Sequence, residues 1–315
     1  MSFIFKIITI GTLAGALSGF FSTLFLKSLY YVTDLRVSNP YIILLLPVFG
    51  LFLAYLSKNI PLNVDVSIKD IKSHLNQNKV FTSTLVTPFV FLASLGTHLF
   101  GGSAGREGVG VIMGASLSSR VGTLFRLDYK ISKTLLLYSG VAAGFSSIFG
   151  APIAAIIFAY EIDRFKRIKE RSLFLIVVTS SIVSYYTTRL LNLKHYTPDV
   201  SFNISYQIII YILISGVTCG AGALAYFHAI RLYKKYTLTF FKNVYLRYFF
   251  GCVVIVATIF LFNAFDYAGI GTTFINDSFL ERRSFYDFLL KFILTTLTLG
   301  IGFKGGEVTP LLFMG

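Results

Sequence analysis

Long apolar runs with almost no charge alternate with short polar segments along the chain. A further, less clean stretch runs from about 284 to 303. The charge-free runs cover residues 7–26 and 28–33, 41–57, 80–105, 134–160, 172–188, 200–230 and 248–265. A spanning helix needs about 20 apolar residues, so most of these runs are long enough to cross a bilayer. The pattern therefore predicts an all-α, polytopic integral membrane protein.

Two further apolar segments, 107–119 and 307–315, are too short to span a membrane. Short helices at membrane depth are tolerated only inside protein or beside an aqueous cavity, because lipid cannot satisfy exposed backbone groups. These segments predict re-entrant half-helices. Segment 58–79 is the most polar stretch and predicts a short helix near the membrane surface.

The composition supports the membrane prediction and excludes other classes. Charged residues make up 13% of the 315 residues and hydrophobic residues 55%, whereas a soluble domain carries about 25% charged residues. The chain is too apolar for a disordered protein. The net charge of +14 does not indicate nucleic-acid binding, since the basic residues lie in short loops. Cys219 and Cys252 lie in apolar runs without CxxC spacing, so we expect inert packed or lipid-facing thiols.

The positive charges also predict an orientation. Segments 161–171 and 231–247 are strongly basic, and the positive-inside rule places both in the cytoplasm. Two spans, 172–188 and 200–230, lie between them, which agrees with that placement. The N-terminal run has small residues at Ala14 and Ala16 and could be read as a signal peptide. Its apolar run continues to Val32, which favours a retained helix.

Glu107 is the first candidate for chemistry. It lies in GGSAGREGVGVIMG (101–114), beside Arg106 and between apolar stretches. Ionisable residues inside a membrane are costly and are functional candidates. If a helix begins at Glu107, its free N–H groups and positive dipole end form an anion site, which the carboxylate can occupy until it is protonated. The alternative is a structural Arg106–Glu107 ion pair near the surface.

Glu307 lies in a second segment of the same kind, GIGFKGGEVTPLLFMG (300–315). Both segments read as a glycine turn, an acid and an apolar half-helix, and Pro310 suits the first turn of a helix. Discontinuous helices in two halves of a chain indicate a transporter site near the midplane. The alternative for Glu307 is an N-terminal cap that complements the helix dipole.

Segment 138–162 is rich in small residues, which allow close helix packing, and Pro152 after Gly150 predicts a break and a new helix. His98 lies in an apolar helix and is read as a packed histidine rather than a proton relay. A P-loop, a Rossmann motif and an HExxH motif are absent from the sequence. We therefore predict no metal and no cofactor. A membrane enzyme is the least favoured class, because no nucleophile–base or metal constellation is present.

Three segments resemble the CLC family of chloride channels and proton-coupled anion antiporters. The family's GxSAGREGP-type segment is GGSAGREGV (101–109), and its GxxAGxxxxFxAPxAGxxFxxE-type helix is GVAAGFSSIFGAPIAAIIFAYE (140–161). Its GxFxP-type segment aligns with GGEVTP (305–310). Order and spacing match over the whole chain. The resemblance implies one transport domain of two inverted repeats, from about 5–190 and from about 200.

The resemblance also implies site residues. The backbone N–H groups of Arg106, Glu107 and Gly108, and those of Glu307 and Val308, would face a halide anion. Glu107 falls on the family's gating glutamate, which accepts the external proton, and we expect Glu307 to serve as a second protonatable or coupling group. The resemblance further implies a homodimer with one pore per subunit, in the bilayer of a bacterial plasma membrane.

Departures from the family pattern indicate a subtype. Val109 stands where proline is common, and residues 61–70 (PLNVDVSIKD) lack the GSGxP segment whose serine contacts chloride. Ile162 stands at the internal proton-transfer glutamate, one residue after Glu161. Together with GFKGGEVTP (302–310), these departures resemble the fluoride-exporting branch, which exchanges fluoride for protons.

Two alternatives to that function stay open. One is a passive chloride channel, with anion flux but no proton movement. The other is a non-transporting remnant, because Gly315 falls inside the half-helix that starts near Glu307, where the family continues with further helices. The second repeat is then truncated, and we expect the chain to be a fragment.

Overall fold

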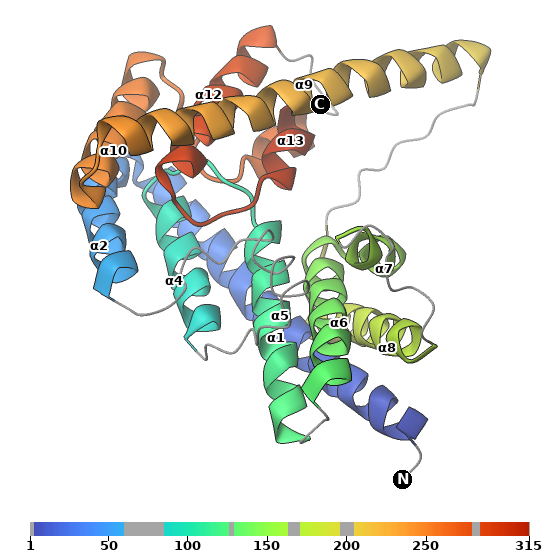
Figure 1. The fold of residues 1–315 in the computed structure, drawn as a ribbon. Helices are drawn as coiled ribbons and strands as arrows, with labels where there is room; N and C mark the ends of the chain where they lie inside the picture. The colour runs from blue at the N-terminus through green and yellow to red at the C-terminus, as the bar shows by residue number, and fades with distance from the viewer. Residues whose placement is uncertain are drawn as a thin grey trace. The chain divides into compact units, whose positions relative to one another are not determined.

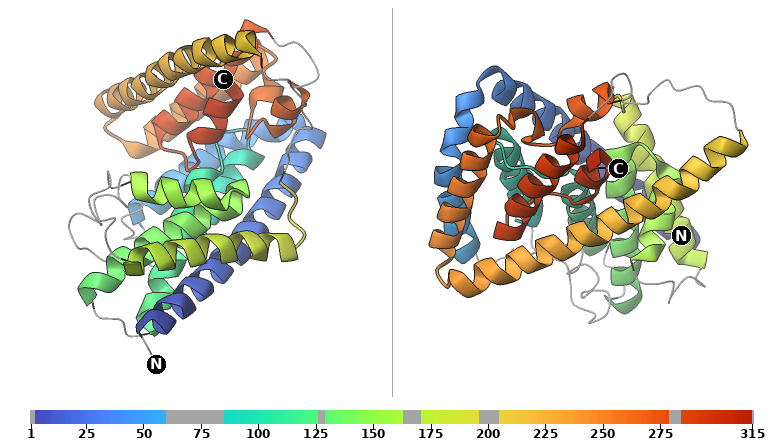
Figure 2. Two further views of the ribbon diagram at one scale, coloured as in Figure 1. Left: turned by 90° about the vertical axis from the view of Figure 1, so that its right-hand side faces the viewer. Right: turned by 90° about the horizontal axis from the view of Figure 1, so that it is seen from above.

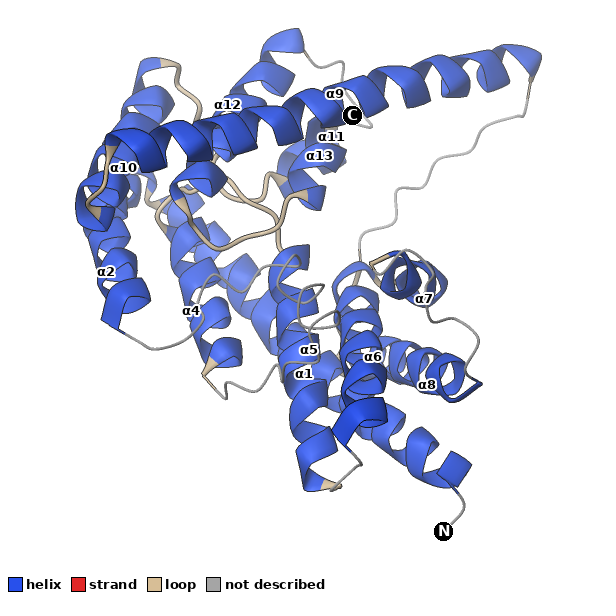
Figure 3. Cartoon of the chain, viewed as in Figure 1, coloured by secondary structure: helices blue, strands red, loops and turns tan. Residues whose placement is uncertain are grey.

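The computed structural model describes residues 3–59, 85–125, 129–162, 171–195, 205–278 and 284–314. Within these ranges every regular element is a helix (Figure 3). In chain order (Figure 1) they are α1 (Phe3–Ser38), η1 (Pro40–Leu45), α2 (Leu46–Asn59), α4 (Val86–Leu99), α5 (Glu107–Leu124), α6 (Tyr129–Phe149), α7 (Pro152–Glu161), α8 (Arg171–Leu190), α9 (Tyr206–Phe240), α10 (Val244–Leu261), η2 (Phe265–Tyr267), α11 (Thr272–Asp277), α12 (Phe285–Ile301) and α13 (Val308–Met314).

Five of the described helices are long and apolar enough to cross a membrane: Ile4–Ser38, Pro40–Asn59, Arg171–Leu190, Tyr206–Phe240 and Val244–Leu261. Their composition and length agree with the spans expected from the apolar runs. The prediction of an all-α membrane protein is confirmed.

Helix α1 runs without interruption through Lys27, which divides two apolar runs in the sequence. The ammonium of Lys27 donates to the carbonyl oxygen of Leu191 at 2.9 Å. A long lysine side chain can lie along a helix surface and bring its charge to a polar partner. The charge therefore does not break the helix.

Helix α9 corrects the predicted loop at 231–247. The helix continues to Phe240, and α10 begins at Val244, so the basic residues 231–235 are helical. Lysine and arginine are good helix formers, and neither glycine nor proline occurs between 231 and 240. The chain turns at Asn243, whose Oδ1 accepts from the N–H of Tyr245 at 2.9 Å. A cytoplasmic location of this segment stays a prediction.

The remaining helices differ from the predicted segments mainly in length. Helix α4 occupies only Val86–Leu99 of the predicted run 80–105, and residues 80–84 lie outside the described ranges. Helix α5 has 18 residues, longer than the predicted half-helix 107–119. The predicted break after Gly150 is confirmed: α6 ends at Phe149, Gly150 has φ +69°, and α7 starts at Pro152. Residues 60–79, the surface-helix prediction, lie outside the described ranges.

The chain forms two compact units that interleave in the sequence. Unit 1 comprises Met1–Tyr31, Ile60–Leu92 and Arg106–His195, and unit 2 comprises Val32–Asn59, Ala93–Gly105 and Tyr196–Gly315. The division into two inverted repeats stays a prediction.

Unit 1 is packed through small residues, as its sequence predicts. A Cβ on Gly114 in α5 would lie 2.2 Å from the carbonyl oxygen of Gly140 in α6, so only glycine permits this helix contact. Serines join α6 to α8: the hydroxyl of Ser146 donates to the carbonyl of Ser181, and that of Ser184 to the carbonyl of Ala143, both at 2.8 Å. Figure 2 shows the helices of this unit from two further sides. Close backbone contact and polar bonds of this kind hold helices together in lipid.

Unit 2 combines close contacts with aromatic packing. A Cβ on Gly50 of α2 would lie 2.5 Å from the sulfur of Cys252 in α10. Phe49 packs against Phe100 and Phe303, with ring centroids 5.0 and 6.3 Å apart. Cys252 is buried and Cys219 exposed, and neither takes part in a disulfide among the described residues. Their inert role stays a prediction.

Candidate anion site

The loop before α5 begins with a glycine turn at the end of α4. Gly101 has φ +88°, a conformation that glycine adopts without steric cost. The N–H of Gly102 donates to the carbonyl of Thr97 at 2.7 Å and closes the helix end. A Cβ on Gly101 would also lie 2.8 Å from Cγ1 of Ile43. The first glycines of the predicted motif therefore stop α4 and direct the chain toward α5.

Helix α12 holds this loop through two threonines. The N–H of Ser103 donates to Oγ1 of Thr298 at 3.1 Å, and the hydroxyl of Ser103 lies 2.9 Å from Oγ1 of Thr295. All three side chains are buried. Neither threonine was predicted from the sequence, because they lie 195 and 192 positions from Ser103 along the chain.

Two glycines join the segments that precede α5 and α13. The N–H of Gly105 donates to the carbonyl of Gly306 at 2.8 Å, and the N–H of Gly306 donates to the carbonyl of Gly105 at 2.7 Å. This reciprocal pair is an isolated antiparallel bridge inside unit 2. Each glycine lies two residues before the first residue of its helix, Glu107 or Val308. The two similar sequence segments are thus paired through their backbones.

Glu107 is the first residue of α5, and its side chain is 2% exposed. Its Oε2 accepts from the backbone N–H of Arg106 at 2.9 Å. The guanidinium of Arg106 extends to Tyr30, where Nη1 donates to the phenol oxygen at 2.8 Å. The carboxylate therefore occupies one of the backbone donors at the start of α5.

The first turn of α5 is suited to an anion. Gly108 and Val109 are buried, and within the described residues no side chain caps the helix at Arg106. The first N–H groups of a helix lack partners inside it, and the helix dipole favours negative charge there. The Nε of Arg106 is also buried and has no hydrogen-bond partner in the described part of the chain. These donors can stabilise a small anion in low dielectric.

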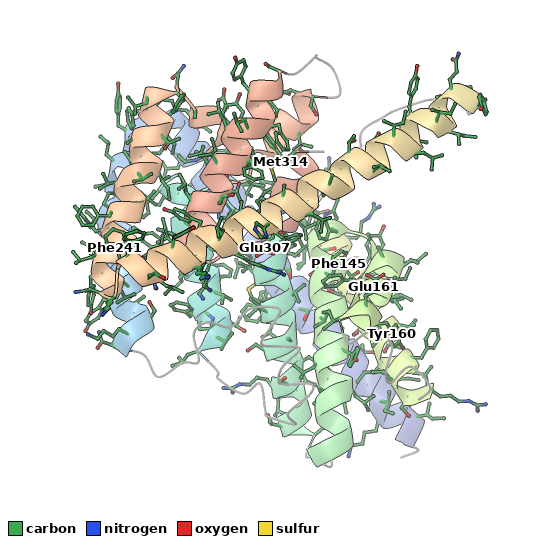
Figure 4. The ribbon with its side chains drawn as sticks, turned by 45° about the horizontal axis from the view of Figure 1, so that its top comes forward. Phe145, Tyr160, Glu161, Phe241, Glu307 and Met314 are labelled. Carbon is green, nitrogen blue, oxygen red and sulfur yellow. The ribbon has the colours of Figure 1, made fainter. Side chains whose placement is uncertain are left out.

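Glu307 and Val308 are arranged differently. Glu307 is exposed and lies directly before α13, whose seven described residues run from Val308 to Met314. Pro310 lies in the first turn of α13, as predicted, and is buried. Figure 4 labels Glu307, which precedes α13, Met314, the last residue of that helix, and Glu161, the last residue of α7. Glu307 and Glu107 belong to different units, so each is placed only within its own unit.

Lys291 in α12 is a buried charge that was not among the predicted site residues. Its ammonium donates to the carbonyl oxygens of Tyr267, Gly269 and Ile270 at 3.1, 2.8 and 3.1 Å. It also lies 5.0 Å from the ring centroid of Phe313 in α13. The three donors of the ammonium each have an acceptor, so the side chain holds the loop 267–270 in place and also contacts α13. Its position inside the apolar run 284–303 could have marked Lys291 as a candidate, because charged residues inside a membrane are rarely incidental.

His195 follows α8 in unit 1. A Cβ on Gly150, where φ is +69°, would lie 2.5 Å from Cδ2 of its ring, so glycine is needed at that turn. Burial lowers the pKa of His195, and the positive charges of Arg106 and Arg189 lower it further. The imidazole is therefore held in its neutral form beside the break between α6 and α7.

By fold and by site, the chain is a polytopic membrane transport protein with a helix that begins at a buried acid. A family model described as voltage gated chloride channel matches residues 49–315. A chloride/fluoride channel protein of Pseudomonas syringae pv. tomato is 30% identical over 326 residues, which cover 100% of this chain and 71% of that protein. The chain therefore belongs to the CLC family of voltage-gated chloride channels, and its class of activity is CLC-type anion transport.

Two solved structures resemble the chain closely. A CLC-type fluoride/proton antiporter matches with a TM-score of 0.90 and 31% identity, covering 100% of this chain and 80% of that one. A slow cyanobacterial chloride/proton antiporter matches with a TM-score of 0.83, covering 98% and 77%, but at 17% identity this likeness shows the fold alone. The resemblance to the CLC family and the helical transporter fold are confirmed.

Proposed function

We propose that this protein exchanges fluoride for protons across a bacterial plasma membrane, with Glu107 as both gate and proton acceptor. The observation that carries the proposal is the hydrogen bond from the N–H of Arg106 to the carboxylate of Glu107, at the buried start of α5. The similarity to a chloride/fluoride channel protein and to the structure of a fluoride/proton antiporter supports the choice of anion.

The gate works through competition for the same donors. An ionised Glu107 carboxylate accepts from the Arg106 N–H and keeps an anion away through its negative charge. One proton converts the carboxylate to a neutral carboxylic acid, whose oxygens are weaker acceptors than those of the ion. The side chain is then free to leave, and the anion takes its place at the N–H groups of Arg106, Glu107 and Gly108. The departing carboxylic acid carries the proton.

Fluoride is a small anion that binds water strongly, so its site must replace lost hydration with several hydrogen bonds. Backbone N–H groups at a helix start are fixed donors that need little reorganisation. In our proposal, Glu307 and Val308 of α13 contribute to the same anion path. The support for those two residues is the family resemblance alone.

The proposal is tested by anion efflux from proteoliposomes. Vesicles are loaded with fluoride or with chloride, efflux is started with a potassium ionophore, and external pH is followed. We expect fast fluoride release with proton uptake and little chloride release. Comparable chloride release would place the protein in the chloride branch. Fluoride release without proton movement would indicate a passive channel, which the word "channel" in the name of the Pseudomonas relative supports.

Assembly and orientation stay predictions of the family resemblance and of the charge pattern. We expect a homodimer, which cross-linking in membranes followed by electrophoresis would detect. We expect segments 161–171 and 231–247 to face the cytoplasm. With Cys219 and Cys252 replaced by alanine, a cysteine introduced at exposed Lys235 should then react only with membrane-permeant reagents in intact cells.

A further inference from the structure

His98 lies near the end of α4 and is completely buried in unit 2. Its two ring nitrogens each lie beside a backbone carbonyl: Nδ1 is 2.7 Å from the oxygen of Ser94, and Nε2 is 3.0 Å from the oxygen of Ala104. The Ser94 hydroxyl is a further neighbour of Nδ1, at 3.5 Å. A carbonyl oxygen can only accept, so the contact to Ala104 is a hydrogen bond in the tautomer that carries its hydrogen on Nε2. In that tautomer the Ser94 hydroxyl can donate to Nδ1.

The bond to Ala104 fixes a peptide plane three residues before Glu107. The carbonyl of Ala104 and the N–H of Gly105 belong to one peptide unit and point in opposite directions. The carbonyl is held by His98, and the N–H donates to Gly306 at 2.8 Å. Both ends of this peptide are therefore hydrogen bonded, and it cannot rotate without breaking two buried bonds.

The next peptide unit is held at both ends as well. The carbonyl of Gly105 accepts from the N–H of Gly306 at 2.7 Å, and the N–H of Arg106 donates to the Glu107 carboxylate at 2.9 Å. Of these N–H groups, only that of Arg106 becomes available when the Glu107 side chain leaves. An anion at the start of α5 must face N–H groups and not carbonyl oxygens, whose partial negative charge would repel it. If the Ala104–Gly105 peptide rotated, the loop would present a carbonyl oxygen where it now presents an N–H group, or the reverse.

We propose that His98 is a positioning residue for anion binding: its Nε2–H holds the Ala104 carbonyl away from the anion and thereby orients the N–H groups that begin α5. This inference rests on the proposed function for its effect on transport. Arg36 and Lys291 are the charged groups that act on the ring. Both are cations that oppose a second proton on the ring, so the ring carries one hydrogen, which the proposal places on Nε2.

Two amide variants separate the two ring nitrogens. The amide nitrogen of His98→Gln takes the place of Nε2 and can still donate to Ala104, whereas that of His98→Asn takes the place of Nδ1 and reaches only Ser94. We expect His98→Asn to raise the half-saturating fluoride concentration about tenfold, the size of one lost buried hydrogen bond. We expect His98→Gln to stay within about twofold of the natural protein. Efflux is expressed per folded protein, measured by size-exclusion chromatography.

A purely structural role would lower the yield of folded protein in both variants and leave the half-saturating concentration unchanged. That result would overturn the proposal, and so would equal impairment of the two variants. Hydrogen–deuterium exchange gives a readout that does not depend on transport. Peptides that cover 100–108 should exchange faster in His98→Asn than in His98→Gln, and equal exchange would contradict the proposal.

A third measurement needs no variant and decides the matter if neither variant folds. In protein labelled with nitrogen-15 histidine, the Nε2 resonance of His98 should be that of a protonated, hydrogen-bonded nitrogen. An unprotonated Nε2 would overturn the proposal. If the natural protein moves no anion, the proposed function fails, while the exchange and resonance experiments still test the role of His98.

Discussion

The starts of α5 and α13 come from similar sequences, yet their acids lie in different surroundings. Glu107 is the first residue of α5 and is 2% exposed, whereas Glu307 precedes the first residue of α13 and is exposed. The paired glycines Gly105 and Gly306 provide a common reference, because each lies two residues before its helix. The acids therefore differ by one residue in register, which turns a side chain by about 100° around a helix axis.

The supports of the two segments differ as well. Helix α5 lies against α6 through glycine contacts, and its preceding loop is held by His98 and the threonines of α12. Helix α13 is held by Phe313, which lies over the ammonium of Lys291. A shared motif thus gives a backbone pairing, while burial and register distinguish the two acids, and the proposed function assigns the gate to the buried one.

The largest expected effect is at Glu107. We expect Glu107→Gln to abolish proton coupling, because an amide cannot release or take up a proton at neutral pH. Glu307→Gln is the matched variant, and we expect it to reduce proton coupling and not to eliminate it, since Glu307 is exposed. External pH during fluoride efflux from proteoliposomes measures both. Full proton movement in Glu107→Gln would refute the assignment, and a total loss in Glu307→Gln would remove the distinction between the two acids.

Lys291 tests the support of α13. We expect Lys291→Met to destabilise the protein by about 3 kcal/mol, because three carbonyls, two of them in buried contacts, lose their donor. Lys235→Met is the control, at an exposed position of α9 where the charge has little effect on stability. Denaturant titration in detergent measures the free energy of unfolding. A change at Lys291 no larger than the change at Lys235 would show that the carbonyl contacts do not stabilise the fold.

Gly114 tests the support of α5. We expect Gly114→Ala to destabilise the protein by about 2 kcal/mol, because the new methyl would lie 2.2 Å from a carbonyl oxygen of α6. In Gly220→Ala the methyl would meet nothing within 4 Å, and alanine favours a helix over glycine by roughly 1 kcal/mol. The two substitutions should therefore have opposite signs in the same titration. A neutral Gly114→Ala would mean that α5 and α6 can separate at little cost.

His195 should give the smallest effect, a loss of stability at acid pH. Burial, Arg106 and Arg189 lower its pKa below the ordinary 6.5. As pH falls below 6.5, the unfolded chain takes up the proton first, so stability declines until pH reaches the lowered pKa and does not change further below it. We expect the melting temperature of His195→Gln to change less with pH over this window than that of the natural protein. An unchanged pH profile in His195→Gln would assign the decline to another group.

The sequence predicted the helical class, the break at Gly150 and the positions of the two acids. Those predictions were possible because apolar runs, glycine turns and proline starts are local signals. The length of α9 was mispredicted because basic residues were read as a loop, although they are good helix formers. The role of Lys291 was missed because its acceptors, from Tyr267 to Ile270, belong to a loop that periodicity does not describe.

The sequence by itself determined which segments are apolar enough to lie in a membrane, where their helices break and which acids lie at helix starts. It also carried the family motifs, since these are short and contiguous. Only the tertiary structure decided that Gly105 pairs with Gly306, that His98 holds Ala104 and that Glu107 is buried while Glu307 is exposed. The physical reason is distance along the chain: hydrophobicity and turn preferences act between neighbours, whereas these hydrogen bonds and burial depend on how distant segments meet.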